Sequence, residues 1–129
     1  MKNLEKKESY IVGRATSLKH AVRGMLLFTR VTPNFWFHFV TFIVCIILGF
    51  VFSISKNEWL ALIIANGLVI GAEAINSAIE IDMDVTHPGY NPMVRDTKDI
   101  AAGAVLIIGI TAYIVDAVIL LPKIIWLFV

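Results

Sequence analysis

Residues 59–79, "WLALIIANGLVIGAEAINSAI", form an apolar run of the length that crosses a lipid bilayer. A hydrocarbon core about 30 Å thick needs roughly 20 apolar residues in a helix. Two further runs have this character, 35–52 and 100–121. Lipid offers no partner for backbone N–H and C=O groups, and three strands could not close a barrel. The sequence therefore predicts an all-α integral membrane protein with three transmembrane helices.

The composition agrees with this prediction. Apolar residues make up 58% of the chain, whereas roughly 45–50% is usual for a soluble domain. The 129 residues fit one domain, 1–129, and the net charge of +1 gives no indication of nucleic-acid binding. The polar start "MKNLEKKESY" carries no signal peptide, so we expect the first apolar run to be retained as a span.

The segment 9–30, "SYIVGRATSLKHAVRGMLLFTR", precedes the first span and combines apolar with basic residues. Its apolar residues recur at spacings of three and four: Ile11, Ala15, Leu18, Val22 and Met25. Basic residues are interleaved with them: Arg14, Lys19 and Arg23. This pattern predicts an amphipathic helix that lies on the membrane surface.

The positions of the basic residues predict the orientation. Of the 11 Lys and Arg residues, seven lie before the first span and two lie in 81–99, whereas only Lys56 and Lys123 lie on the other side. Because such an excess marks the cytoplasmic side, we expect the N-terminus and the 81–99 loop in the cytoplasm and the C-terminus outside. Pro88, Gly89 and Pro92 predict that 81–99 is not helical.

Four polar residues follow one face of the second helix: Glu73, Asn76, Glu80 and Asp84, here called the polar stripe. At about 100° per residue they fall within roughly 80° of one another. A carboxylate at membrane depth costs roughly 2.5–3.5 kcal/mol, so packing alone explains two of them poorly. The alternative is that the polar stripe lies near the end of the helix, where its side chains only contact water as the helix leaves the membrane.

The stretch "RDTKDIAAGAV", 95–105, opens the third span and places Lys98 and Asp99 where that span emerges. With Glu73 and Glu80, these residues could converge at one cleft in the cytoplasmic leaflet. Carboxylates suit Mg²⁺, a lysine can hold phosphates, and a base can take the proton of an attacking hydroxyl, so the combination suggests phosphoryl transfer. The alternative is that Lys98 and Asp99 anchor the helix and that "AAGA" is a close-packing patch.

The pattern "EAINSAIE" (73–80) followed by "RDTKDIAAGAV" resembles the small bacterial membrane kinase family of diacylglycerol kinase and undecaprenol kinase. The resemblance covers nearly the whole chain, including "SLKHAVRG" (17–24) and "NFWFH" (34–38). It implies ATP-dependent phosphorylation of a membrane lipid alcohol, diacylglycerol or undecaprenol, at the cytoplasmic leaflet of the bacterial plasma membrane. It also implies a homotrimer with shared active sites.

The resemblance implies roles for individual residues. Glu73 matches a general base for the lipid hydroxyl, Asn76 matches the amide beside it, and Glu80 matches a ligand of the Mg²⁺ bound to ATP. The nucleotide site would include Asp84, Lys98 and Asp99. Arg14 and Arg23 of the surface helix would offset phosphate charge.

One position departs from the family pattern. Thr32 stands in "RVTPNFWFH" where the family usually carries a glutamate that shares the metal with the counterpart of Glu80. A hydroxyl is a poorer Mg²⁺ ligand than a carboxylate. The alternative function is therefore a catalytically weak or inactive kinase-like lipid-binding membrane protein. A small transporter or proton channel that uses Glu73 is a third possibility, although no acid lies in the middle of the other two spans.

Three further polar residues lie within the apolar runs. We interpret His38 as an interfacial histidine that reaches for headgroups, with a bond to the polar stripe as the alternative. Asn66 fits an interhelical hydrogen-bond donor. Asp116 is expected near the outer end of its span, where it pairs with Lys123 or reaches water.

Overall fold

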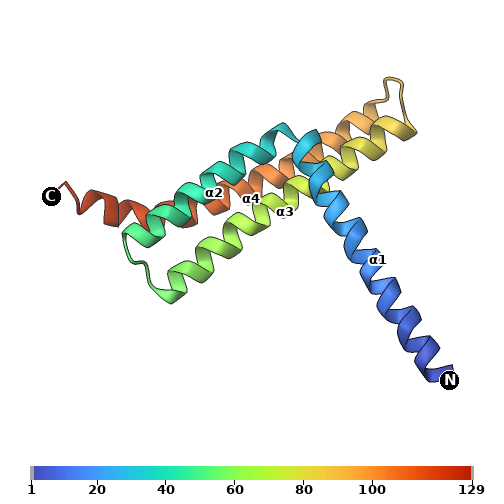
Figure 1. The fold of residues 1–129 in the computed structure, drawn as a ribbon. Coiled ribbons are helices and arrows are strands. Elements are labelled where there is room, and N and C mark those ends of the chain that lie inside the picture. The colour runs from blue at the N-terminus through green and yellow to red at the C-terminus, as the bar shows by residue number, and fades with distance from the viewer. Residues whose placement is uncertain (1, 129) are drawn as a thin grey trace. The chain divides into compact units, whose positions relative to one another are not determined.

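The structure, a computed structural model, describes residues 2–128, with side chains from residue 13 onward, and contains four helices (Figure 1). They are α1 (Lys2–Val31), α2 (Pro33–Val51), α3 (Lys56–Thr86) and α4 (Pro92–Ile125). The predicted all-α fold is confirmed. Helices α2, α3 and α4 are each long and apolar enough to cross a membrane, which is consistent with the three predicted spans. The helices form two units that divide between Val31 and Thr32.

Helix α1 is longer than the predicted segment 9–30 at both ends. Leu18, Val22 and Met25 are exposed on it, and the Ser17 hydroxyl donates to the carbonyl of Gly13 at 3.0 Å. The side chains of residues 9–12 lie outside the described part. The amphipathic character of α1 and its location on a membrane surface stay predictions.

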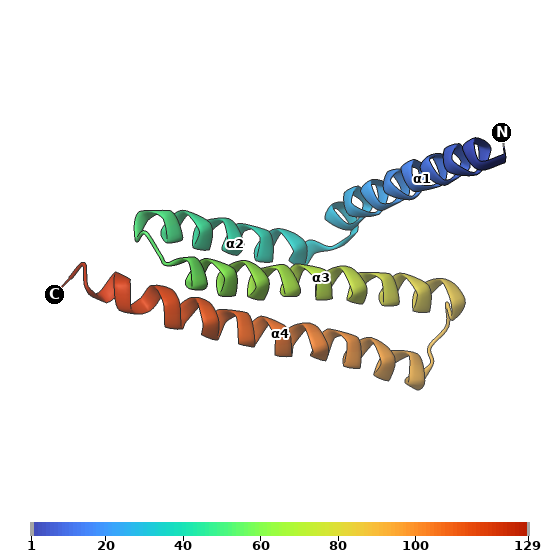
Figure 2. The same cartoon turned by 90° about the horizontal axis from the view of Figure 1, so that it is seen from below.

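The second unit is a bundle in which α2, α3 and α4 lie side by side (Figure 2). Helices α3 and α4 make the most extensive contact, α2 packs mainly on α3, and α2 and α4 touch least. Because α2 is shorter, α3 and α4 continue past its beginning toward the loop that joins them (Figure 2). The first turn of α2 therefore meets the middle of α3, where the polar stripe begins.

The end of the bundle at the α2–α3 connection has an apolar core made of Cys45, Ile54, Leu62, Ile119 and Leu120. Gly49 allows α2 to approach the indole of Trp59 closely, since a Cβ at Gly49 would lie 2.8 Å from Trp59 Cη2. Any larger residue would push these elements apart.

Helix α3 begins with a capping box. The backbone N–H of Ser55 donates to Glu58 Oε2 at 2.7 Å, and the N–H of Glu58 donates to Ser55 Oγ at 3.4 Å. Glu58 also forms an ion pair with Lys123 at 3.0 Å, which ties the start of α3 to the end of α4. The expected pairing of Lys123 with Asp116 is therefore wrong.

The predicted loop 81–99 is wrong in extent, because only residues 87–91 lie between α3 and α4. The apolar run ends near residue 79, but the helix continues to Thr86 with polar residues. Pro92 sits at the start of α4, where a helix needs no N–H from it, and Asn91 Oδ1 accepts from the N–H of Met93 at 2.9 Å. Asp84, Lys98 and Asp99 are consequently on helices rather than on a loop.

Large apolar side chains cover the outer surfaces of the bundle. Soluble monomers rarely expose a contiguous apolar surface of this extent, so it is the surface expected to face lipid. Examples from the three helices are Trp36, Val40, Ile47, Ile64, Leu68, Ile107, Ile114 and Val118.

Candidate active site

The polar stripe of α3 changes from buried to exposed along the helix. Glu73 is 2% exposed and Asn76 is 8% exposed, whereas Glu80 is half-buried and Asp84 is exposed. The side chains of Asn76 and Glu80 are joined, because Asn76 Nδ2 donates to Glu80 Oε1 at 3.1 Å. Glu73 and Asn76 are therefore buried within the bundle rather than solvated at the end of the helix, and the stripe reaches the surface only at Asp84.

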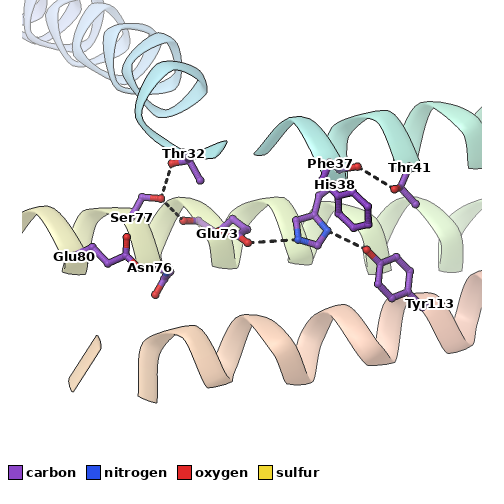
Figure 3. A network of polar contacts seen from close by, with 9 residues as sticks. All are labelled: Thr32, Phe37, His38, Thr41, Glu73, Asn76, Ser77, Glu80 and Tyr113. Carbon is purple, nitrogen blue, oxygen red and sulfur yellow. Dashed lines mark hydrogen bonds and ion pairs between the residues drawn. The ribbon is translucent and has the colours of Figure 1, made fainter. Parts of the chain in front are cut away.

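Glu73 is held by the first turns of α2. Glu73 Oε1 lies 3.4 Å from His38 Nε2, and His38 Nδ1 lies 3.3 Å from the hydroxyl of Tyr113 on α4 (Figure 3). The structure thus supports the alternative for His38, a contact with the polar stripe. The three residues come from three helices, and His38 is the link between the other two.

Thr32 belongs to a second chain of hydrogen bonds, which ends at the backbone carbonyl of Glu73. Thr32 Oγ1 and Ser77 Oγ are 2.6 Å apart, and Ser77 Oγ donates to the backbone carbonyl of Glu73 at 2.9 Å (Figure 3). Because Ser77 uses its one hydroxyl proton on that carbonyl, Thr32 must be the donor to Ser77. Thr32, which is 5% exposed, therefore joins the start of α2 to α3.

The residues present fit a magnesium ion that arrives with a nucleotide. Asn76 Oδ1 is buried and accepts no hydrogen bond from any described residue, and the Glu80 carboxylate is beside it. Both are hard oxygen donors of the kind that Mg²⁺ selects. Over the described part of the chain, no three His, Cys, Asp or Glu side chains gather as a protein-only metal site. Mg²⁺ is commonly held by one or two carboxylates together with substrate phosphates, so two oxygen donors are consistent with it.

Lys98 and Asp84 meet where α3 and α4 leave the apolar region. Lys98 Nζ donates to both oxygens of Asp84, at 2.9 and 3.1 Å. Lys98 lies outside the apolar run 100–121, and its pKa is raised above its ordinary value, chiefly because it donates to Asp84 and also because Glu80 attracts its charge. Lys98 therefore stays an ammonium and lies within electrostatic reach of Glu80.

Asp99 points to a different partner from Lys98. Its carboxylate lies 3.7 Å from Arg95 Nε, one helical turn earlier, and both side chains are largely exposed. A cavity of about 590 Å³ lies between the end of α3 and the start of α4. Its lining includes Asp84, Arg95, Lys98 and Asp99, so it combines two cations with two carboxylates.

Arg14 and Arg23 lie on α1, in the first unit. Their expected part in nucleotide binding stays a prediction, as do the roles expected of the other site residues.

Two residues of this site, Ser77 and Tyr113, are not predicted from the sequence. Ser77 could have been found, because it lies four residues after Glu73 and so shares its face of the helix. Nothing in one sequence indicates that Tyr113 of α4 comes opposite His38 of α2.

Asp116 differs most from expectation. It is 7% exposed and accepts hydrogen bonds from Asn66 Nδ2 and from Cys45 Sγ. The prediction that it reaches water is wrong, whereas the interhelical hydrogen bond expected of Asn66 is confirmed. Cys45 is a donor in this cluster as well as an apolar filler.

Three membrane-length helices around a buried carboxylate define a multi-pass membrane protein with a polar site inside its bundle. The chain belongs to the prokaryotic diacylglycerol kinase family, whose model matches residues 19–120. It is therefore a lipid kinase and a bacterial membrane protein, as the resemblance implied.

Two named relatives support this membership. The chain is 34% identical over 107 residues to the undecaprenol kinase of Bacillus subtilis (strain 168), a match that covers 83% of this chain and 87% of that protein. It is 31% identical over 114 residues to the diacylglycerol kinase of Synechocystis sp., which covers 88% of this chain and 65% of that protein. No solved structure matches the chain.

Proposed function

We propose that this chain transfers the terminal phosphoryl group of ATP to the hydroxyl of a membrane lipid alcohol, diacylglycerol or undecaprenol, at the cytoplasmic leaflet. The observation that carries the proposal is Glu73. It is a buried carboxylate within a membrane-length helix, it contacts His38, and it shares a helix face with the joined pair Asn76 and Glu80. A member of a lipid kinase family needs such a group where the lipid hydroxyl meets the nucleotide.

Glu73 is the base in this mechanism. Removal of the hydroxyl proton during attack on the phosphorus makes the oxygen a better nucleophile. Burial excludes water that would compete for the phosphoryl group. The bonds through Ser77 and Thr32 support the backbone at Glu73, so the carboxylate is held in a fixed position.

Glu80 and Asn76 would hold the Mg²⁺ that accompanies ATP. Bound there, the ion would neutralise charge on the transferring phosphates. The unpartnered Oδ1 of Asn76 supports this assignment, because a buried amide oxygen without a partner is costly and a cation would satisfy it.

The nucleotide would occupy the cavity between the ends of α3 and α4. Lys98 would move from Asp84 to the phosphates, and Asp99 would support the same region with Arg95. Arg14 and Arg23 of α1 would add positive charge to this site. The cavity lies at the end of the bundle that the distribution of Lys and Arg assigns to the cytoplasm, where ATP is present.

The proposed assembly is a homotrimer with active sites shared between subunits and with the C-terminus outside. Gly67 and Gly71 support close contact between copies. They are exposed on α3, and a Cβ at either position would meet no described atom within 4 Å apart from the neighbouring backbone of α3 itself. Small residues of this kind let transmembrane helices approach each other.

The alternative of a catalytically weak lipid-binding protein gains no support from the relatives, both of which are named as kinases. The Thr32 hydroxyl donates to Ser77, and a neutral hydroxyl is a poorer Mg²⁺ ligand than a carboxylate, so the proposed mechanism does not use it as a metal ligand. In the proposed mechanism, phosphate oxygens and water complete the metal shell.

The test uses the full chain in phospholipid nanodiscs with radiolabelled ATP and either diacylglycerol or undecaprenol. We expect labelled lipid phosphate from at least one lipid, and a fall in kcat of about 100-fold or more for Glu73→Gln. Asp82→Asn is the matched control, because it removes an exposed carboxylate from the opposite face of the same helix. Absence of product with both lipids refutes the function, and a Glu73→Gln enzyme as active as Asp82→Asn refutes the base.

A further inference from the structure

A cavity of about 360 Å³ lies at the end of the bundle opposite the polar stripe. Five residues line it: Phe52, which follows α2, and Pro122, Lys123, Trp126 and Leu127 at the end of α4. Figure 2 shows that the end of α4 and the α2–α3 connection lie at the same end of the bundle, away from the α3–α4 loop. The cavity is therefore separate from the candidate active site, and the proposed function does not use it.

The cavity lies at the level where the apolar spans end. The apolar run of α4 ends at Leu121, directly before the first residue of this helix that lines the cavity. Trp126 is 85% exposed, and a tryptophan in such a place is typical of the boundary between hydrocarbon and headgroups. The N–H groups of Trp126 and Leu127 donate to the carbonyls of Pro122 and Ile124, at 3.2 and 3.1 Å, so a hydrogen-bonded turn holds both side chains at the cavity. A lipid headgroup and the first part of its acyl chains are both within reach of this wall.

The polar side chains of the cavity wall are hydrogen-bond donors. Lys123 is its only charged residue, and the Trp126 indole can donate but not accept. Lys123 Nζ lies 3.0 Å from Glu58 Oε1, and the Lys123 side chain is 30% exposed. An ammonium group has three donors, and Glu58 is the only acceptor that contacts this one among the described residues. A ligand of this cavity should therefore present acceptors and negative charge.

Glu58 leaves Lys123 able to bind a second anion. The Glu58 carboxylate also accepts the N–H of Ser55 at 2.7 Å. It lies in the first turn of α3, where the aligned peptide dipoles favour a negative charge. Because two other features of the helix start stabilise this carboxylate, Lys123 can contact another anion while Glu58 keeps its partners.

The apolar side of the cavity joins two helices that contact each other little. Helices α2 and α4 touch least of the three pairs in the bundle. Phe52, at the end of α2, packs on the apolar core, whereas the other residues of the wall belong to the end of α4. An acyl chain in the cavity would extend this core and contact both helices.

We propose that an anionic phospholipid binds in this cavity, from the leaflet opposite the proposed nucleotide site. Its phosphate contacts Lys123, and an acyl chain lies along Phe52, Trp126 and Leu127. An anionic headgroup is preferred to a zwitterionic one, because the ammonium of a zwitterionic headgroup is repelled by Lys123. The lipid is a structural ligand that joins α2 to α4, and it is not a substrate.

The first experiment uses Trp126 as a fluorescent reporter in the full chain, with Trp36 and Trp59 changed to phenylalanine. This parent protein is placed in phosphatidylcholine nanodiscs that contain brominated phosphatidylglycerol or brominated phosphatidylcholine at equal mole fraction. We expect an apparent affinity for the brominated phosphatidylglycerol that is about two- to fivefold higher, the range that one partly exposed ion pair produces. Equal quenching by the two lipids overturns the proposal. Absence of quenching by both also overturns it, because another occupant, such as a second copy of the chain, then covers the cavity.

Matched variants of the parent locate the effect. Lys123→Gln should abolish the preference for phosphatidylglycerol, and Lys123→Arg should keep it. Glu58→Gln breaks the same ion pair but leaves the cation in place, and glutamine is compatible with the capping box, so the preference should remain. Lys56→Gln removes an exposed lysine at the same end of the bundle that does not line the cavity, and it should behave like the parent. Loss of the preference in Glu58→Gln, or an equal loss in Lys56→Gln, overturns the phosphate site.

The second experiment tests whether the lipid joins the helices. Unfolding by a denaturing detergent is followed in mixed micelles that contain phosphatidylglycerol or phosphatidylcholine. Because a ligand of the folded state stabilises it, phosphatidylglycerol should raise the midpoint of unfolding of the parent above that in phosphatidylcholine. Lys123→Gln should unfold at the same midpoint in both lipids, whereas Lys56→Gln should keep the difference. Equal midpoints of the parent in the two lipids overturn the structural role. Neither experiment requires kinase activity, so a failure of the proposed function does not affect them.

Discussion

The side-chain amide of Asn66 donates to both carboxylate oxygens of Asp116, at 2.9 and 3.2 Å, across the contact between α3 and α4. The same nitrogen donates its other proton to the carbonyl of Leu62 at 3.1 Å. Cys45 Sγ of α2 completes the cluster at 3.4 Å from Asp116 Oδ2. The cluster joins all three helices near the apolar core, in the half of the bundle away from the α3–α4 loop.

We expect Asn66→Ala to lower the free energy of unfolding by about 1–2 kcal/mol, because it leaves a buried carboxyl group with the weak Cys45 donor alone. The measurement is unfolding by a denaturing detergent in mixed micelles. Asn57→Ala, at an exposed position of the same helix, should change stability by less than about 0.5 kcal/mol. Equal stabilities of the two variants would contradict a stabilising role for the cluster.

Glu80→Gln should lower the affinity of the active site for Mg²⁺. An amide oxygen carries no net charge and binds Mg²⁺ less well than a carboxylate, so the Mg²⁺ concentration for half-maximal activity should rise about tenfold or more. Titration of lipid kinase activity with Mg²⁺ at fixed ATP gives this value, and a chelator should abolish activity in both proteins. Asp82→Asn, on the opposite side of α3, should titrate like the wild type. If the Mg²⁺ titration curve of Glu80→Gln overlays that of the wild type, Glu80 is not a ligand of the metal.

Lys98→Gln should raise the KM for ATP about 10- to 100-fold, the range that a lost hydrogen bond to a charged group of about 1.5–3 kcal/mol produces. The comparison is with Lys56→Gln, which neutralises an exposed lysine at the other end of the bundle. Steady-state kinetics at saturating lipid provide the KM. The assignment of Lys98 to the phosphates fails when both variants have the KM of the wild type.

Gly49→Ala should destabilise the bundle by about 1–3 kcal/mol, because its methyl group would lie 2.8 Å from Trp59 Cη2 and something must shift. Trp59→Phe removes the atoms that clash, so the cost of Gly49→Ala should be smaller in that background. Gly67→Ala is the control, since its Cβ meets no described atom within 4 Å apart from the neighbouring backbone of α3 itself. Additive effects of Gly49→Ala and Trp59→Phe in the unfolding measurement would show that the indole is not the cause.

The three spans could be predicted from the sequence because lipid imposes a simple requirement, an apolar run of sufficient length. The helix ends could not be predicted in the same way. An apolar run marks the membrane, and a helix can continue beyond it, as α3 does through Asp84 to Thr86. In the sequence Pro92 predicts a break in a helix, whereas at the first position of α4 it is compatible with a helix.

The polar stripe could be predicted because all its members lie on one helix, whose periodicity fixes which residues share a face. Contacts between helices follow from their packing and register, which one sequence does not contain. His38 with Glu73, Thr32 with Ser77 and Asn66 with Asp116 are all of this second kind. For Asn66, the sequence predicted an interhelical hydrogen bond, but it could not indicate that Asp116 is the partner.

Helix α3 carries both ends of the polar stripe without interruption, from the buried Glu73 to the exposed Asp84. At 1.5 Å per residue, the two carboxylates are separated by about 16 Å along the axis. No flexible joint in α3 can change this spacing, so the depth of Glu73 below the membrane surface depends on how the bilayer matches the helix. In the proposed mechanism, a thicker or thinner membrane would therefore shift Glu73 relative to the headgroups, while Asp84 at the proposed nucleotide end would stay in water.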